Sequence, residues 1–354
     1  MVDGPGDFRA YAGRRVLVTG HTGFKGSWLC LWLTRLCAQV TGYSDAVPTD
    51  PSHFAALHLP IEDRRGDVAD ERAVAAAIEA AKPEIVFHLA AQPLVRRAYA
   101  DPIGTYRTNV LGTLTVMEAA RRCGVGAFVS ATTDKVYRND ESGRRYCEDD
   151  ELGGSDPYSA SKSCVELMTR SYRESFLGDG RMLLATVRAG NVIGGGDWAE
   201  DRLIPDLVRA ANSGQPALIR NPGSTRPWQH VLDVLAGYLE VGARLLVRDA
   251  TAAEAWNFGP TSTAGISVAD IIAAVQKRLP ELRIDYQPEI AGRHESGLLQ
   301  LNSEKAASTL GWQPRWEETM LDRTFEWYAA FRDDRTISGD QLTDYEQALG
   351  GGGR

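Results

Sequence analysis

Short apolar runs rich in β-branched residues alternate with longer helix-like stretches through the first half of the chain. The strand-like runs are Val16–Thr19, Gln39–Tyr43, Ile85–Leu89, Ala127–Ala131 and Leu183–Arg188, and the helix-like stretches are Ser27–Leu36, Glu71–Ala81, Pro102–Arg122 and Tyr158–Phe176. Strands that alternate with helices of this length predict βαβ units. The strands EIVFHLAA and AFVSA are apolar on both faces, which is typical of a sheet covered by helices on each side. The pattern therefore predicts an α/β protein with a doubly wound parallel sheet.

Composition narrows the class of protein. The chain has 354 residues, is 43% hydrophobic and carries a formal net charge of −8, which suits a globular protein with a sizeable core and argues against nucleic-acid binding. No stretch approaches 18 apolar residues in a row, and the first ten residues lack an apolar leader, so we expect no membrane segment and a cytoplasmic protein. The five cysteines are scattered without metal-ligand spacing, so we expect no metal site.

Three glycines, Gly20, Gly23 and Gly26, follow the first expected strand at three-residue intervals, where the first expected helix begins. Backbone N–H groups at a helix N-terminus lack partners within the helix, and the helix dipole is positive there. The missing Cβ atoms permit a tight turn and the close approach of a pyrophosphate. A glycine-rich turn can also simply join a strand to a helix, but its position inside a βαβ unit favours dinucleotide binding.

Two acidic residues are candidates for holding the adenosine end of a dinucleotide. Asp45 lies near the place, about 20 residues beyond the glycines, where such proteins often hold the ribose with a carboxylate. A solvated turn aspartate fits Asp45 equally well. Asp67 follows an expected third strand and could accept a hydrogen bond from the adenine amino group, or it could form an Asx turn or start a helix.

Two further patterns carry acid–base chemistry. Thr133, Asp134 and Lys135 end a buried strand with a hydroxyl, a carboxyl acid and an amine base, and ligands of open α/β sheets bind at the carboxyl ends of strands. Solvated loop residues would look similar. Tyr158 and Lys162 are four residues apart in an expected helix and share a face. An ammonium group beside a phenol lowers the phenol pKa from about 10, which makes a tyrosinate base accessible at neutral pH.

Together these motifs resemble the extended short-chain dehydrogenase/reductases, which combine TGxxGxxG, the strand HLAAQ, Asn109 in TNVLGT, and Thr133 ahead of YxxxK. Asp134-Lys135 resembles the nucleotide-sugar 4,6-dehydratases, most of which have Asp-Glu there, and the Asp-Lys pair is that of the CDP-glucose 4,6-dehydratases. The stretches VTGHTGFKGSWL, FHLAAQPLVR, VRAGNVIGGGDWAEDRLIPD, RPWQHVL and LGWQPRW are also similar to theirs. Thr132 is a small departure, because Ser is expected there.

The resemblance implies an NAD-dependent hydro-lyase that converts CDP-glucose to its 4-keto-6-deoxy form. Tyr158 would take the C4 hydroxyl proton while hydride passes to NAD, with Lys162 on the nicotinamide ribose and Thr133 on the C4 oxygen. Lys135 would then take the C5 proton and Asp134 would protonate the departing C6 hydroxyl, before hydride returns to C6.

The resemblance also implies which residues bind the two ligands. Cofactor contacts are expected from Gly20, His21, Gly23, Phe24, Lys25, Gly26, Asp67, Val68, Leu89, Ala90, Ala91, Thr108, Tyr158 and Lys162. Substrate contacts are expected from Gln92, Asn191, Asp197, Arg202, Arg226, Arg293 and His294. A lone loop histidine such as His294 is also compatible with a solvated side chain, and we expect Trp228 to be packed.

The expected domain organisation follows from the same resemblance. Residues 1–188 form an NAD-binding Rossmann domain, with returning segments near 228–262. Residues 189–227 and 263–335 form a smaller, mixed sugar-nucleotide-binding domain, and 336–354 form a flexible tail. Family members pair through helices corresponding to Pro102–Arg122 and Tyr158–Phe176, which implies a homodimer or homotetramer.

Two other functions are compatible with parts of the sequence. Another NAD-dependent nucleotide-sugar enzyme, either a 4-epimerase or a dehydratase for a different nucleotide, would share the Tyr158 and Lys162 pair. An epimerase needs no acid–base pair for dehydration, so Asp134-Lys135 distinguishes the two. A non-catalytic dinucleotide sensor would be expected to lose the Tyr158 and Lys162 pair, which this chain retains.

Overall fold

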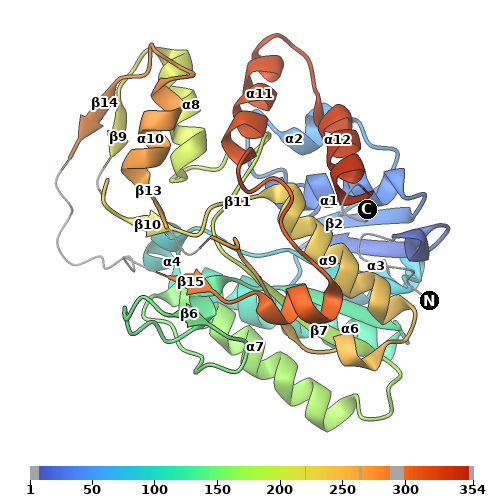
Figure 1. Ribbon diagram of the computed structural model, residues 1–354. Helices are drawn as coiled ribbons and strands as arrows, with labels where there is room; N and C mark the ends of the chain where they lie inside the picture. The colour runs from blue at the N-terminus through green and yellow to red at the C-terminus, as the bar shows by residue number, and fades with distance from the viewer. Residues whose placement is uncertain (1–7, 220, 263–264, 288–298, 351–354) are drawn as a thin grey trace.

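Seven parallel strands form the central sheet of the computed structural model, which describes residues 8–219, 221–262, 265–287 and 299–350 (Figure 1). The strand order is β12-β7-β5-β4-β1-β2-β3. These strands are β1 (Arg15–Thr19), β2 (Gln39–Ser44), β3 (Glu62–Arg65), β4 (Ile85–His88), β5 (Ala127–Ala131), β7 (Leu183–Ala189) and β12 (Ala255–Phe258). The order reverses between β1 and β4, the place where ligands bind in open α/β sheets. The expected doubly wound parallel sheet is confirmed.

Helices cover both faces of the sheet. The longer helices are α1 (Phe24–Arg35), α3 (Glu71–Ala81), α6 (Gly112–Arg122), α7 (Pro157–Phe176), α8 (Leu203–Ser213), α9 (Val231–Leu246), α10 (Val268–Gln276), α11 (Met320–Arg332) and α12 (Ser338–Gly350). Short ones are α2 (His53–Leu57), α4 (Val95–Ala100), α5 (Pro102–Tyr106), η1 (Arg9–Tyr11), η3 (Asp134–Val136) and η4 (Ala250–Ala252), with π-helical turns η2 (Arg107–Leu111) and η5 (Ala306–Leu310). Apolar residues of α3 and α6 bury one face of the sheet, and those of α1 and α9 bury the other.

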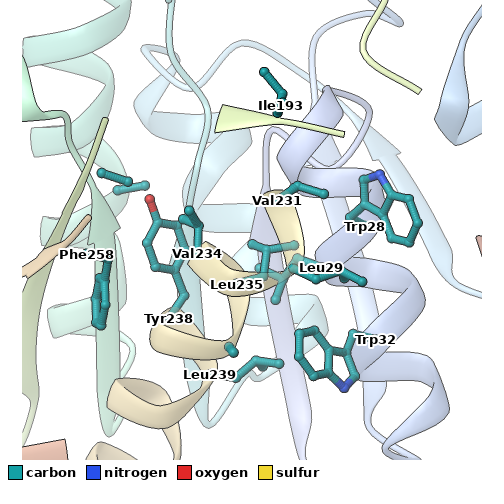
Figure 2. Close-up of a cluster of buried hydrophobic side chains, with 14 of the residues drawn as sticks. Trp28, Leu29, Trp32, Ile193, Val231, Val234, Leu235, Tyr238, Leu239 and Phe258 are labelled. Carbon is teal, nitrogen blue, oxygen red and sulfur yellow. The ribbon is translucent and has the colours of Figure 1, made fainter. Parts of the chain in front are cut away.

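The packing of α1 on α9 explains the tryptophan-rich stretch after the glycines. Figure 2 shows Trp28, Leu29 and Trp32 of α1 facing apolar side chains of α9, and all three are fully buried. Burying one such side chain contributes about 1.5–3 kcal/mol. This contact fixes the start of α1 against the sheet, and with it the glycine turn.

Short strands build a smaller region beside the sheet. The pairs are β9 (Ala217–Ile219) with β14 (Ile284–Tyr286), β10 (Thr225–Arg226) with β13 (Ile266–Ser267), β8 (Val192–Ile193) with β11 (Gln229–His230), and β6 (Arg145–Tyr146) with β15 (Gln300–Leu301). In Figure 1, β9, β14, α8 and α10 stand together away from the central sheet, whereas α9 and β12 return to it. The expected domain boundaries stay a prediction.

The C-terminal segment differs from the expectation of a flexible tail, because most of it forms helix α12. Leu342 and Tyr345 are fully buried, and the Tyr345 hydroxyl donates to Asp233 Oδ1 of α9 at 2.8 Å. The apolar residues are few and lie among polar ones, so the sequence pattern alone did not indicate this packing. Residues 351–354 lie outside the described residues.

The expected helix Pro102–Arg122 is interrupted. It consists of α5, the π-helical turn η2 and α6. π-Helical turns often occur at functional sites, and this one contains Asn109 and Thr108. Among the described residues, no helix combines the length and the apolar character needed to cross a bilayer.

Candidate active site

The glycine turn has the geometry expected of a phosphate-binding loop. Gly20 has a φ of 71°, and a Cβ there would lie 2.6 Å from the backbone nitrogen of Ala90. A Cβ on Gly26 would overlap the carbonyl oxygen of Gly20. Helix α1 begins at Phe24 after an N-cap glycine, Gly23, that provides no side-chain cap. The start of α1 therefore fits the pyrophosphate of a dinucleotide such as NAD.

The expected cofactor residues beside this turn follow the carboxyl ends of β1 and β4. His21 is fully buried, with Nδ1 2.9 Å from Ser44 Oγ and Nε2 2.9 Å from Asp63 Oδ1. Burial lowers its pKa, against the opposing effect of Asp63. Its ring is thus already hydrogen bonded, so a cofactor contact from His21 would come from its backbone. Leu89 and Ala90 follow β4 directly, and their backbone nitrogens donate to Thr19.

The two acidic candidates for the adenosine end lie in different settings. Asp67 forms the Asx turn considered from the sequence, since Ala69 N donates to Asp67 Oδ1 at 2.8 Å, and its carboxylate also pairs with Arg107 at 2.7 Å. Val68 is buried against the start of α6. Asp45 is exposed in the turn after β2. The adenine and ribose contacts of these residues stay predictions.

The side chain of Gln92, an expected substrate contact, already forms hydrogen bonds within the protein. Its side-chain amide donates to Leu94 O and Thr105 Oγ1 and its carbonyl accepts from Leu94 N. The Gln92 backbone nitrogen is held by Asn109 Oδ1 at 2.8 Å. This bonding fixes the loop after β4 and leaves the side chain no free polar group.

Helix α7 brings Tyr158 and Lys162 to the carboxyl end of β5. It begins at Pro157, and Asp156 caps it by accepting from Tyr158 N at 2.9 Å. Both side chains are more than nine-tenths buried. The Lys162 ammonium donates to Ala131 O, the last residue of β5, at 3.0 Å. The tyrosine and lysine therefore face the strand end that bears the threonine and the acid.

Thr133, Asp134 and Lys135 follow the carboxyl end of β5 and lie in the same site. Thr133 Oγ1 donates to Asp134 Oδ1 at 2.8 Å, and both side chains are buried. Burial raises the pKa of the Asp134 carboxyl, against Lys135, Thr133 and Arg226, which lower it. A carboxyl group with a raised pKa is suited to acting as an acid at neutral pH. Lys135 is half-buried and lies close enough to Asp134 to lower its pKa.

The electrostatics differ from the simplest expectation for a tyrosine and lysine pair. Burial raises the pKa of Tyr158 to about 12, and the groups that lower it most are Thr133, through a hydrogen bond, and Arg202. Burial and the nearby Lys25 ammonium lower the pKa of Lys162 to about 7. Lys162 is thus only partly charged at neutral pH, which weakens the effect expected of it on Tyr158. Arg202 also lowers the pKa of Tyr158 and so takes over part of the role expected of Lys162.

The loop between β8 and α8 is held by hydrogen bonds from neighbouring helices and carries two of the expected substrate residues, Asp197 and Arg202. Asp197 Oδ2 accepts from Arg202 at 2.8 Å, and the Asp197 carbonyl accepts from Tyr328. Trp28 Nε1 donates to Gly195 O at 2.8 Å, so α1 and α11 both hold this loop. The loop is rigidly anchored, and its Arg202 lies close enough to Tyr158 to act on its pKa.

The remaining substrate candidates divide into those near the site and those that are not described. Arg226, in β10, lies near enough to Asp134 to lower its pKa. The Asn191 carbonyl accepts from Gln229 N, which joins the loop after β7 to β11. Trp228 is buried, as expected. Arg293 and His294 lie outside the described residues.

Lys25, which the resemblance places among the cofactor contacts, lies beside a residue of the site that was not identified from the sequence, Tyr238. The Lys25 ammonium lies 5.7 Å from the centroid of the Tyr238 ring and interacts with Arg202, Asp134 and Asp197, and burial lowers its pKa to about 8. The Tyr238 hydroxyl is buried without a hydrogen-bond partner in the described part of the chain. No sequence signal marks Tyr238, because it lies within an apolar helix.

Comparison with known proteins gives consistent results. The model of a family described as "NAD dependent epimerase/dehydratase family" matches residues 16–257. The chain is 45% identical to a CDP-glucose 4,6-dehydratase of Salmonella typhimurium, over 97% of this chain and 99% of that protein.

Two solved structures are similar along nearly the whole chain. The epimerase Mth375 of Methanothermobacter thermautotrophicus superposes with a TM-score of 0.80 at 28% identity, covering 92% of this chain and 95% of the other. MoeE5, solved with UDP-glucose and NAD, superposes with a TM-score of 0.76 at 28% identity, covering 90% and 99%.

Proposed function

Since the chain belongs to the NAD dependent epimerase/dehydratase family, we propose that it is a CDP-glucose 4,6-dehydratase, which forms CDP-4-keto-6-deoxyglucose without net oxidation. The observation that carries the proposal is the gathering of Thr133, Asp134, Lys135, Tyr158 and Lys162 around the end of β5. This set supplies both a base for oxidation at C4 and an acid–base pair for loss of water across C5 and C6.

The first half of the reaction depends on the α7 pair. Tyr158 takes the proton of the C4 hydroxyl, and Thr133 donates to the oxygen on which negative charge develops. NAD held at the start of α1 would supply the hydride acceptor for C4 and the hydride donor for C6, and its positive ring would favour the tyrosinate form of Tyr158. Lys162 orients the nicotinamide ribose, and Arg202 opposes the burial that raises the pKa of Tyr158 to about 12. The base thus becomes effective when the site is filled.

The second half depends on the strand end. A C4 keto group acidifies the C5 proton, which Lys135 removes and gives back to C5 after water has left and a hydride has returned to C6. Asp134, whose pKa is raised by burial, donates a proton to the departing C6 hydroxyl. The Arg226 guanidinium suits the substrate diphosphate because its planar fork binds such oxygens through two hydrogen bonds.

An epimerase is the second candidate, and the residues after Thr133 argue against it. Epimerisation needs Tyr158 and Lys162 but no proton donor for a C6 hydroxyl. A buried Asp134 hydrogen bonded to Thr133 is therefore expected of a dehydratase. A non-catalytic sensor would not need the buried tyrosine and lysine that this chain keeps.

The test is to incubate the purified protein with CDP-, dTDP- and UDP-glucose and to determine product masses. The proposal predicts loss of one water from CDP-glucose, with weaker binding or slower turnover of dTDP-glucose. A product of unchanged mass would favour an epimerase, and equal efficiency with all three nucleotides would contradict the cytidine assignment.

We also propose that the protein pairs through α5, η2 and α7. These elements pack beside one another and expose Ile103, Tyr106, Leu111 and Leu167, with 81% of Ile103 accessible. Exposed apolar side chains gathered on neighbouring elements mark an interaction surface. A homodimer or homotetramer would cover them. The cytoplasmic location expected from the sequence stays a prediction.

A further inference from the structure

A buried ion pair lies next to the candidate catalytic residues and is not part of the chemistry proposed above. Arg188 of β7 donates through Nε to Glu166 Oε1 at 2.9 Å and through Nη2 to Oε2 at 2.8 Å. The two side chains are 4% and 1% exposed. Desolvation of such a pair often costs as much as the attraction returns, so stability alone does not account for a buried pair.

The ion pair holds the chain just before the strand-end candidates. The Thr132 hydroxyl donates to Glu166 Oε1, and Thr132 directly precedes Thr133. A second hydroxyl, that of Thr186 in β7, donates to Oε2 at 2.8 Å. Burial alone would raise the pKa of Glu166, but Arg188 and these hydroxyls lower it, so the carboxylate stays ionised and accepts all four bonds.

The same pair holds the chain just after those candidates. Arg188 Nη1 donates to the Tyr137 hydroxyl at 2.6 Å, and that hydroxyl donates to Asn257 Oδ1 at 2.7 Å. Tyr137 is fully buried and follows η3 directly. Residues 133–136 therefore form a short bridge between Thr132 and Tyr137, and each of these two flanking residues is hydrogen bonded to the ion pair.

Helix α7 is attached to the same segment of chain, in addition to the contacts through Thr132 and Tyr137. Tyr158, Lys162 and Glu166 are spaced four residues apart and share one face of the helix. Lys162 donates to Ala131 O, and Ser163 Oγ donates to Val136 O at 2.9 Å. The helix that bears the candidate base thus contacts the bridge on both sides, with Glu166 one turn below Lys162.

We propose that Glu166 and Arg188 are positioning residues that fix Asp134 and Lys135 relative to Tyr158, so that water is eliminated from the sugar held by Tyr158. This inference rests on the dehydratase function proposed above. The pair acts through Thr132 on one side and Tyr137 on the other and touches no reacting atom. A displacement of about 1 Å at such a site costs about 10² in rate, so loosening one attachment slows elimination while binding is retained.

The test compares two hydroxyl deletions on the same carboxylate. Thr132→Val removes the bond nearest the bridge, and the matched control Thr186→Val removes a bond to β7 only. We expect similar melting temperatures for the two variants. Thr132→Val should lower kcat for dehydration about tenfold or more with KM nearly unchanged, and NADH should accumulate in single turnover. Thr186→Val should change kcat less than about twofold.

A double variant, Glu166→Gln with Arg188→Met, separates positioning from folding, because it removes both charges together and so leaves no unpaired buried ion. We expect a cooperative thermal transition but a kcat lowered at least as far as in Thr132→Val. Wild-type kcat in this folded double variant, or equal losses in the two threonine variants, would overturn the inference. A wild-type protein that dehydrates no nucleotide-glucose would instead refute the proposed function, and the inference with it.

Discussion

Removal of the Tyr345 hydroxyl should destabilise the protein by an amount that depends on pH. This hydroxyl donates to Asp233 Oδ1, which also accepts from the backbone nitrogen of Arg315 at 2.6 Å. Burial raises the pKa of Asp233 to about 6, so the carboxyl is ionised at pH 8 and mostly protonated at pH 5. The variant Tyr345→Phe removes one donor and leaves the ring packed against Trp32 and Trp316.

The magnitude follows from the charge of the acceptor. A hydrogen bond to a charged group contributes about 1.5–3 kcal/mol and one between neutral groups about 0.5–1.5 kcal/mol. We therefore expect Tyr345→Phe to lose about 2 kcal/mol at pH 8 and about 1 kcal/mol at pH 5. The direction of this pH dependence agrees with the linkage between proton binding and folding. The folded pKa of Asp233 lies above its unfolded value of about 3.9, so this group destabilises the protein increasingly between about pH 4 and pH 6 and by a constant amount above, and loss of a donor raises the folded pKa and extends this range upward.

The assay is urea denaturation of wild type and variant at the two pH values, followed by tryptophan fluorescence. Tyr11→Phe is the matched control, because the buried Tyr11 hydroxyl donates to the uncharged Leu239 carbonyl at 2.7 Å. Its loss should be about 1 kcal/mol at both pH values. A Tyr345→Phe loss that does not change with pH, or that changes no more than the control, would refute the assignment of an ionised Asp233 as the acceptor.

Three further predictions concern the proposed function. Tyr158→Phe should slow hydride transfer by about 10² or more, measured as NADH absorbance in stopped flow, and near-normal turnover would remove Tyr158 from the mechanism. Lys135→Met should allow C4 oxidation but stall elimination, so NADH should accumulate in single turnover; if no NADH appears, Lys135 acts earlier. Ile103→Glu should shift the protein toward monomers in light scattering, whereas Leu218→Glu, at a residue 51% exposed on β9, should not.

The parts of the site that the sequence predicted are those defined by local geometry. The glycine turn depends on three residues beside one strand, and its φ and close contacts match the expectation. Tyr158 and Lys162 share a helix face because of their spacing, and the expected helix Tyr158–Phe176 is present. Such features need only a few neighbouring residues, so one sequence is enough to identify them.

The parts that escaped prediction depend on residues distant in sequence. Helix α12 is ordered by Tyr345 reaching Asp233, 112 residues earlier, and no local pattern encodes that contact. Burial and the approach of Lys25 lower the pKa of Lys162 to about 7. Burial of a charge and the approach of a second cation are properties of the assembled site, so spacing alone could not reveal them.

In the proposed reaction, the charges around Asp134 would connect substrate binding with acid catalysis. Burial raises the pKa of this carboxyl, whereas Arg226 is among the groups that lower it. In the proposed complex, the substrate diphosphate pairs with Arg226 and cancels part of its field at Asp134. The pKa of Asp134 then rises further, and the carboxyl is more fully protonated when the C6 hydroxyl is in place to receive that proton. The same arginine that binds the substrate would thereby favour the acid form that the elimination step needs.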